Sequence, residues 1–161
     1  MATPDRTTVK AAIQALMAEL RANLRSDPPT ATKPFRRIEE GQAAFGEYPR
    51  PFMTVRIVEI KPVGTTEGDK LLRVTIEMRL VTDVIFDDPH DAVLDAVGAV
   101  EDYFDELAAD EQTIVEGADG FEERTWKLGY PTGAAGSQAA EATCRQSCIV
   151  KVEREYNRVP N

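Results

Sequence analysis

The sequence has few of the residues on which metal sites and disulfide frameworks are built. It contains one histidine and two cysteines among 161 residues. The single histidine, His90, excludes any site that needs several imidazole ligands. Cys144 and Cys148 lie four positions apart in a predicted strand, so their Cα atoms are roughly 13 Å apart, too far for a disulfide. We therefore expect both cysteines to be buried free thiols.

Basic residues are also fewer than acidic ones. Lys and Arg together number 19 against 28 Asp and Glu, which gives a net charge of −9. Proteins that wrap a phosphate backbone depend on Lys and Arg to displace counterions, so this balance argues against binding of that kind. It does not exclude a surface past which DNA slides, because an acidic lining repels the duplex.

Long hydrophobic runs are missing as well. No segment approaches the ~18 apolar residues that a membrane-spanning helix needs, and Met1 to Lys10 has no apolar signal core. We expect neither a membrane contact nor a cleaved secretion signal. Because 42% of the residues are hydrophobic, the chain can bury one core, and we predict a single domain over residues 1–161.

No catalytic or phosphate-binding pattern stands out. His90 stands among aspartates at a predicted helix start, where acidic residues favour the helix N-terminus, so we interpret them as capping residues and predict no metal. The adjacent glutamates at 39–40 and at 122–123 would point to opposite faces of a strand. Ser137 and Ser147 lack a nucleophile-elbow context. We predict that the protein is not an enzyme and uses no cofactor.

The clearest structural signal is an alternation between Leu72 and Leu80. Its apolar positions are Leu72, Val74, Ile76, Met78 and Leu80. This period of two predicts a strand with one buried face. Phe52–Lys61 is rich in β-branched residues and predicts a second strand, and the glycines in Pro62–Asp69 predict a hairpin connection between the two. These strands should pair antiparallel.

Two helices are expected on either side of this hairpin. Apolar residues recur at spacings of three and four from Val9 to about Arg25. A second helix should open at Asp88-Pro89, with Asp88 as the N-cap, and continue to about Ala109. The proline-bearing segment at 26–34 cannot continue the first helix and is predicted to be an extended linker, which would let that helix pack away from its sequence neighbours.

The rest of the chain predicts short strands and one loop. A short strand is expected at Phe35–Ile38, and Gln112–Glu116 with Phe121–Leu128 should form a projecting hairpin. Gly129–Ala140 should be a loop, and Thr143–Tyr156 the last strand. The predicted fold class is α+β, with an antiparallel-rich sheet of about four strands packed by two helices and a projecting hairpin or loop.

Three aromatic residues are candidates for an interface. Trp126, Tyr130 and Phe121 belong to or flank the predicted projecting hairpin, and exposed aromatic residues often anchor contacts between proteins. The alternative is that they cover the edge of the sheet.

Charged clusters of both signs could complement one another between subunits. Arg36 and Arg37 are basic, and the second predicted helix carries an acidic cluster. Its members are Glu101, Asp102, Asp105 and Glu106. Opposed patches of this kind suit a head-to-tail ring, with the acidic cluster in its lumen or on its surface, although simple solvation explains the same charges.

The order of these patterns resembles that of tail terminator, or tail completion, proteins of long-tailed bacteriophages. The resemblance rests on the amphipathic helix Val9–Leu24 and on the Tyr/Pro-containing approach to a strand at Tyr48–Val55. It rests further on the strand pair entering the Asp88-Pro89 helix and on the closing strand Cys148–Val152.

The resemblance implies a non-enzymatic virion protein of the tail neck, assembled in the host cytoplasm. Members of the family form a hexameric ring at the head-proximal end of the tail tube, stop tube polymerisation and bind the head connector. DNA passes through the lumen without sequence-specific binding. Two alternatives stay open: another neck or connector-adjacent ring protein, and a small α+β ligand-binding domain or enzyme with a pocket around Trp126 and Tyr130.

Overall fold

The computed structural model describes residues 8–41, 48–66, 68–83, 91–109, 125–129 and 139–153. The elements are α1 (Val9–Leu24), β1 (Arg37–Glu40), β2 (Phe52–Thr66), β3 (Asp69–Asp83), α2 (Asp91–Ala109), β4 (Lys127–Gly129) and β5 (Ala139–Glu153). The predicted α+β class is confirmed, and the described part of the sheet has five strands where about four were expected.

The central strand of the sheet is β3. The strand order is β1-β2-β3-β5-β4, with β3 antiparallel to both β2 and β5, and β1 parallel to β2. The predicted antiparallel hairpin is therefore confirmed. Its strands are longer than expected, because residues 62–66 belong to β2 and β3 begins at Asp69. Gly68 has a φ of 84°, which glycine adopts without a steric penalty.

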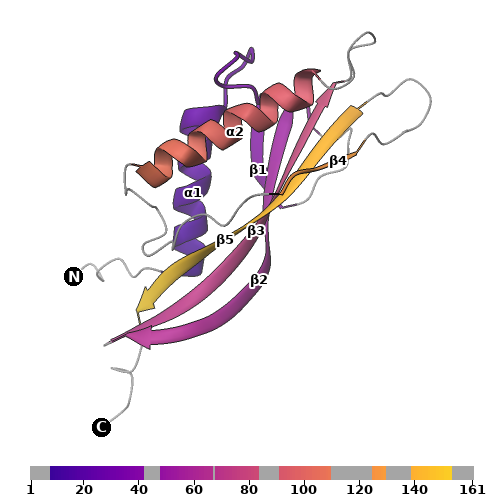
Figure 1. The fold of residues 1–161 in the computed structure, drawn as a ribbon. Coiled ribbons are helices and arrows are strands. Elements are labelled where there is room, and N and C mark those ends of the chain that lie inside the picture. The colour runs from indigo at the N-terminus through magenta and orange to yellow at the C-terminus, as the bar shows by residue number, and fades with distance from the viewer. Residues whose placement is uncertain are drawn as a thin grey trace.

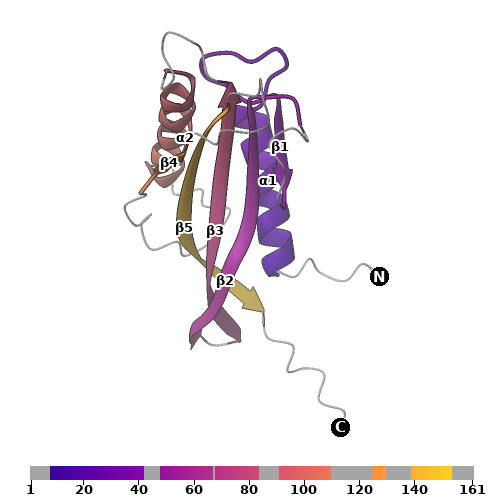
Figure 2. The same ribbon diagram turned by 90° about the vertical axis from the view of Figure 1, so that its right-hand side faces the viewer.

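Both helices cover the same face of the sheet, as Figures 1 and 2 show. The apolar side chains predicted to face the core from β3 do so, and Val74, Ile76, Met78 and Leu80 are buried. From α1 the core receives Ala12, Ile13, Leu16, Met17, Leu20 and Leu24. From α2 it receives Val93, Ala96, Val100, Tyr103 and Phe104. One core cluster thus joins both helices to the sheet.

The first helix has well-defined ends. The Thr8 hydroxyl accepts a hydrogen bond from the Ala11 amide at 3.0 Å, which satisfies one of the free amides of the first turn. At the other end Arg25 is extended, with φ −102° and ψ 133°. The predicted helix, Val9 to about Arg25, agrees with α1 within one residue.

The segment at 26–34 is not the extended linker that the prolines predicted. The Ser26 amide donates to the Phe35 carbonyl at 2.9 Å, and the Phe35 amide donates to the Leu24 carbonyl at 3.2 Å. The Thr30 amide also donates to the Lys33 carbonyl at 3.0 Å, which closes a turn inside the segment. The chain therefore returns to the end of α1, and Phe35 is fully buried.

Because this loop is closed, α1 packs beside the next element of the chain rather than away from it. The Arg21 side chain donates from Nε to the Ile38 carbonyl at 2.8 Å, which ties α1 to β1. The strand itself spans Arg37–Glu40 rather than Phe35–Ile38.

The long strands continue past the helical layer, at the lower left of Figure 1. β1 pairs with β2 only as far as Val55, and two register shifts interrupt the pairing of β2 with β3 farther along. We call residues 59–66 and 69–73 the strand arm. Two of its large apolar side chains are exposed, Ile60 at 49% and Val63 at 39%. The strand arm is therefore the projecting part of the described fold.

The predicted projecting hairpin, by contrast, lies mostly outside the described residues. This applies to Gln112–Glu116 and to Phe121–Leu128 except for its last four residues, of which Lys127 and Leu128 belong to β4. The closing strand begins at Ala139 instead of Thr143, where small side chains let it lie buried on the sheet. The second helix is described from Asp91.

We predict that replacing Leu20 by Ala will lower the free energy of unfolding by about 2–5 kcal/mol, because a fully buried leucine leaves a cavity. The matched control is Leu94→Ala, since Leu94 is also helical but 52% exposed, and it should change stability by less than about 0.5 kcal/mol. Urea unfolding followed by circular dichroism measures both. Equal losses for the two variants would contradict this description of the core.

Candidate functional site

The described residues hold no group of three or more His, Cys, Asp or Glu side chains that could bind a metal ion. The capping cluster around His90 lies largely outside them. Neither α1 nor α2 is long and apolar enough to cross a bilayer. Three surface features remain to be described: a network of ion pairs, an acidic hollow and the strand arm.

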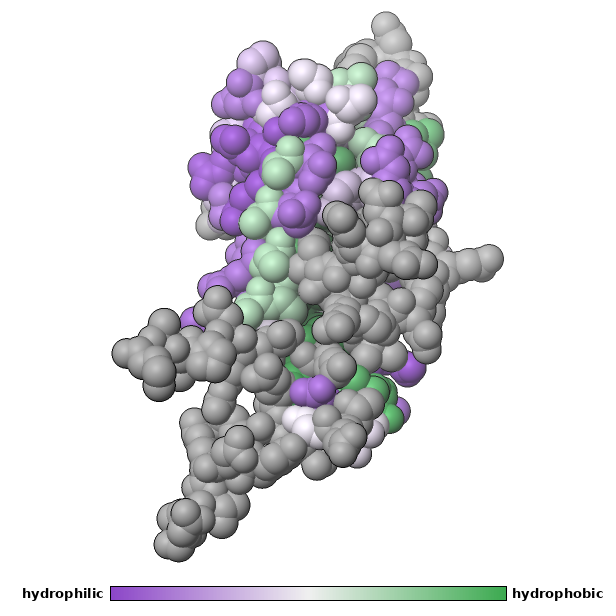
Figure 3. All heavy atoms as spheres, turned by 90° about the vertical axis from the view of Figure 1, so that its left-hand side faces the viewer, coloured by the Kyte–Doolittle hydropathy of each residue, from purple (hydrophilic) through white to green (hydrophobic). Residues whose placement is uncertain are grey.

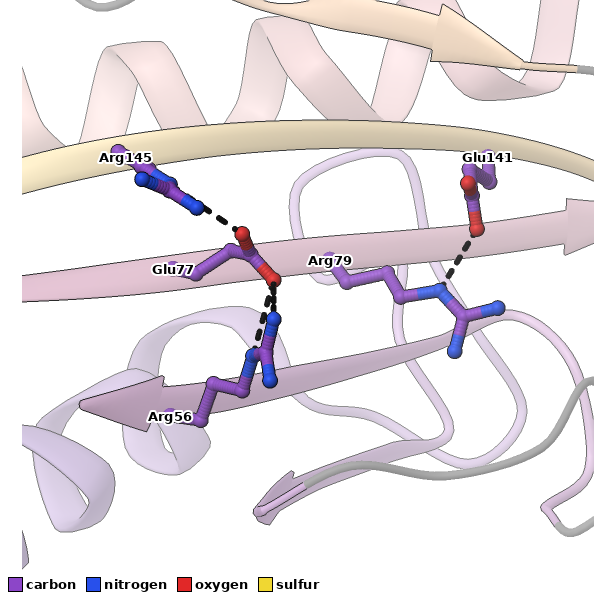
Figure 4. A network of polar contacts seen from close by, with 5 residues as sticks. All are labelled: Arg56, Glu77, Arg79, Glu141 and Arg145. Carbon is purple, nitrogen blue, oxygen red and sulfur yellow. Dashed lines mark hydrogen bonds and ion pairs between the residues drawn. The ribbon is translucent and has the colours of Figure 1, made fainter. Parts of the chain in front are cut away.

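An ion-pair network crosses the face of the sheet opposite the helices (Figure 4). Glu77 on β3 lies between Arg56 on β2 and Arg145 on β5. Its carboxylate accepts from Arg56 Nε at 2.9 Å and from Arg145 Nε at 3.4 Å. Farther along β3, Arg79 donates from Nε to Glu141 of β5 at 2.7 Å. This face of the sheet therefore carries opposite charges side by side.

The strand register places these charges directly opposite one another. Arg56 is the partner of Glu77, Glu77 is the partner of Arg145, and Arg79 is paired with Thr143, two positions from Glu141. Opposite charges on neighbouring strands stabilise a sheet by a few tenths to about 1 kcal/mol per pair. The arrangement neutralises most of the charge within the sheet itself.

The second feature is a hollow of about 510 Å³ between α1 and α2, which we call the interhelical hollow. Its lining combines the end of α1, residues 31 and 32, and one side of α2. Three carboxylates, Asp95, Asp102 and Glu106, line it, and none of its described lining residues is basic. Leu24 and Leu94 contribute apolar surface. The hollow is thus acidic at its rim and partly apolar.

Tyr103 lines the same hollow. Its hydroxyl is buried and has no hydrogen-bond partner, although the residue as a whole is 9% exposed. Burial, and after it the negative charge of Glu19, raises the pKa of Tyr103 to about 12. A buried hydroxyl without a partner is unfavourable in the isolated chain.

The four members of the predicted acidic cluster differ in their exposure to solvent. Asp102, Asp105 and Glu106 are exposed, as expected. Glu101 is half-buried and accepts a hydrogen bond from Trp126 Nε1 at 2.7 Å. Figure 3 shows the helical side of the molecule, where hydrophilic side chains surround a narrow, weakly hydrophobic stripe.

Trp126 has an intramolecular role in the structure. It is half-buried, packs against the core cluster, and its indole ties the chain just before β4 to α2. This agrees with the alternative that the aromatic residue covers the sheet rather than anchoring a partner. Tyr130 and Phe121, the other two interface candidates, lie outside the described residues.

The two arginines predicted to form an interface have partners within the chain. Arg36 donates from Nε to the Arg50 carbonyl at 3.1 Å and pairs with Asp27 at 2.8 Å. Arg37 pairs with Glu39 at 3.2 Å, and its guanidinium lies 4.8 Å from the centroid of the Tyr48 ring. Both arginines therefore stabilise the region around β1.

The strand arm carries charges that the sequence analysis did not single out. Lys61 of β2 is the direct cross-strand partner of Arg73 on β3, and both are exposed. Like charges placed opposite each other destabilise a strand pair. Predicting this register from the sequence requires the exact ends of both strands, which the predicted connection at Pro62–Asp69 did not give.

A scan against models of known protein families finds no match to this sequence. A search of curated proteins finds none either. The surfaces described above are therefore the basis of the functional proposal.

We predict that Glu77→Gln will lower the free energy of unfolding by roughly 1–3 kcal/mol, because two arginines lose their shared, partly buried carboxylate. Glu59→Gln on the exposed strand arm is the matched control and should have an effect within about 0.5 kcal/mol. Denaturant unfolding measures both. No difference between the variants would mean that the network does not stabilise the sheet.

We predict that the free energy of unfolding will fall as the pH rises from 10 towards 12, because the folded chain keeps Tyr103 neutral where the unfolded chain ionises it. The unfolded phenol ionises near its ordinary pKa of 10.0, whereas the folded one ionises near 12. Tyr103→Phe should remove this alkaline loss and should stabilise the fold at pH 7 by roughly 1 kcal/mol, because it deletes an unpaired hydroxyl. Unfolding at pH 7 and pH 11 tests both statements; an unchanged alkaline loss in the variant would contradict them.

Proposed function

We propose that this protein is a structural subunit that assembles head to tail into a ring. The observation that carries the proposal is the strand arm, which extends beyond the helical layer (Figure 1) with Ile60 and Val63 exposed. Exposed apolar side chains on a projecting element are typical of a contact surface. We assign its contact to a different surface of the neighbouring subunit, and a heterologous contact of this kind closes into a ring when its rotation closes.

The particular ring proposed is that of a tail terminator of a long-tailed bacteriophage. It would end the tail tube, join it to the head connector and let DNA pass through its lumen. The resemblance in the order of elements supports this assignment, and the α+β fold is compatible with it. The net charge of −9 suits a channel that must not retain DNA.

The ion-pair network offers a surface suited to such a lumen. Arg56, Arg79 and Arg145 pair with Glu77 and Glu141, so two of their three positive charges are compensated locally. Phosphate binding needs cations that are free to replace counterions. A sheet face with paired arginines would therefore let a duplex pass without binding it tightly.

The proposal is tested by polymerising purified tail-tube protein with and without this chain. We expect tubes whose growth stops early and which carry an extra density at one end only in electron micrographs. Tubes of unchanged length with bare ends would contradict the terminator assignment, and decoration along the tube or binding to the connector alone would favour another neck ring protein.

A pair of variants tests the part taken by the strand arm. Ile60→Asp combined with Val63→Asp should abolish capping, because two exposed apolar contacts become charged. Leu128→Asp is the control, since Leu128 is similarly exposed at 45% but lies on β4. If the arm variant still caps tubes, or if both variants lose capping equally, the arm is not the contact surface.

A further inference from the structure

The interhelical hollow has the properties of a binding site that the isolated chain leaves unsatisfied. None of its three carboxylates, on Asp95, Asp102 and Glu106, forms an ion pair with another described residue. The buried Tyr103 hydroxyl beside them has no partner either. Exposed carboxylates without counter-charges favour a cationic ligand with hydrogen-bonding capacity.

The shape of the hollow leaves room for side chains to enter. Its volume of about 510 Å³ lies within the range of sites that hold several groups of a ligand. Gly98 lies in its wall, and a Cβ atom added there would meet nothing within 4 Å. The apolar surface of Leu94, which is 52% exposed, adds a contact for an aliphatic group. The expected ligand is basic with apolar neighbours.

The strand arm presents this chemistry. Lys61 and Arg73 stand side by side on it, and among the described residues neither has an ion-pair partner, Glu59, the diagonal neighbour of Arg73, included. Exposed Ile60 directly precedes Lys61 in the sequence, and exposed Val63 follows it two positions later. Two adjacent cations would repel less if carboxylates of another molecule were bound between them.

The arm cannot reach the hollow of its own chain. In Figure 1 the tip of the β2–β3 hairpin lies at the lower end of the molecule, whereas the C-terminal end of α1, which lines the hollow, lies at the upper end. Figure 2 shows the same separation. Contact between the two surfaces therefore requires two copies.

We infer that the interhelical hollow of one copy binds the strand arm of a second copy, with Lys61 and Arg73 against Asp95, Asp102 and Glu106. The inference rests on the proposed self-assembly and specifies its contact. Because arm and hollow are different surfaces, each copy offers one of each, and the contact propagates from copy to copy until a ring closes.

Charge reversal tests the contact in the full-length protein. The arm variant is Lys61→Glu with Arg73→Glu, and the hollow variant is Asp95→Lys with Asp102→Lys. Each alone should raise the concentration of half-association roughly 100-fold, because like charges face each other across the contact. An equimolar mixture of the two should recover association to within about tenfold of the unaltered protein, since each variant then meets opposite charges on the other.

Sedimentation velocity over a range of concentrations measures the association. Trp126 fluorescence and circular dichroism confirm that each variant is folded. The control is Lys10→Glu with Lys127→Glu, which changes the net charge as the arm variant does, at exposed positions that belong to neither surface, and should leave association unchanged. Restoration by mixing supports the contact, and full association of either variant alone overturns it.

A steric test is independent of charge. Gly98→Trp should fill the hollow and abolish association, whereas Gly98→Ala adds only a methyl group in open space and should leave it intact. Association of the tryptophan variant at unaltered strength would overturn the inference. If rings still form and cap tubes in that variant, only this contact is wrong. If the unaltered protein stays monomeric and leaves tubes uncapped, the proposed function fails as well.

Discussion

The alternation of side chains along β3 is the constraint on which the rest of the structure depends. One face of this strand holds Val74, Ile76 and Met78 against both helices. The other face holds Glu77 and Arg79 in ion pairs with the two neighbouring strands. A slip of one residue would place the charges in the core and the apolar side chains in water. The core and the ion-pair network therefore select the same register.

The long strands also extend farther than the helices that cover them. Strands of fifteen residues span about 50 Å, whereas the sixteen residues of α1 span about 24 Å. The helical layer can cover only part of the sheet, and the remaining part forms the strand arm (Figure 1). Pro62 and the register shifts in β2 interrupt its free edge, a feature that discourages unspecific strand pairing. Side chains rather than backbone edges are then left to make specific contacts.

The sequence predicted what depends on periodicity and missed what depends on tertiary contacts. The limits of α1, the buried face of β3 and the β2–β3 hairpin follow from spacing and local residue preference. The course of residues 26–34 could not be predicted, because it is set by hydrogen bonds from Ser26 and Phe35 to distant backbone groups. The sequence could not assign Trp126 to the fold, because its hydrogen bond to Glu101 joins elements far apart in the chain. The interhelical hollow needs two helices and a loop to be placed together, which no local pattern encodes.

The most direct test of the account is negative-stain electron microscopy of the purified protein, with the copy number obtained from its native mass. The account predicts closed rings of one size with a central opening, and for a hexamer six chains of 17.8 kDa, or 106.8 kDa. Particles of 17.8 kDa at every concentration, or open chains of variable length, would contradict it.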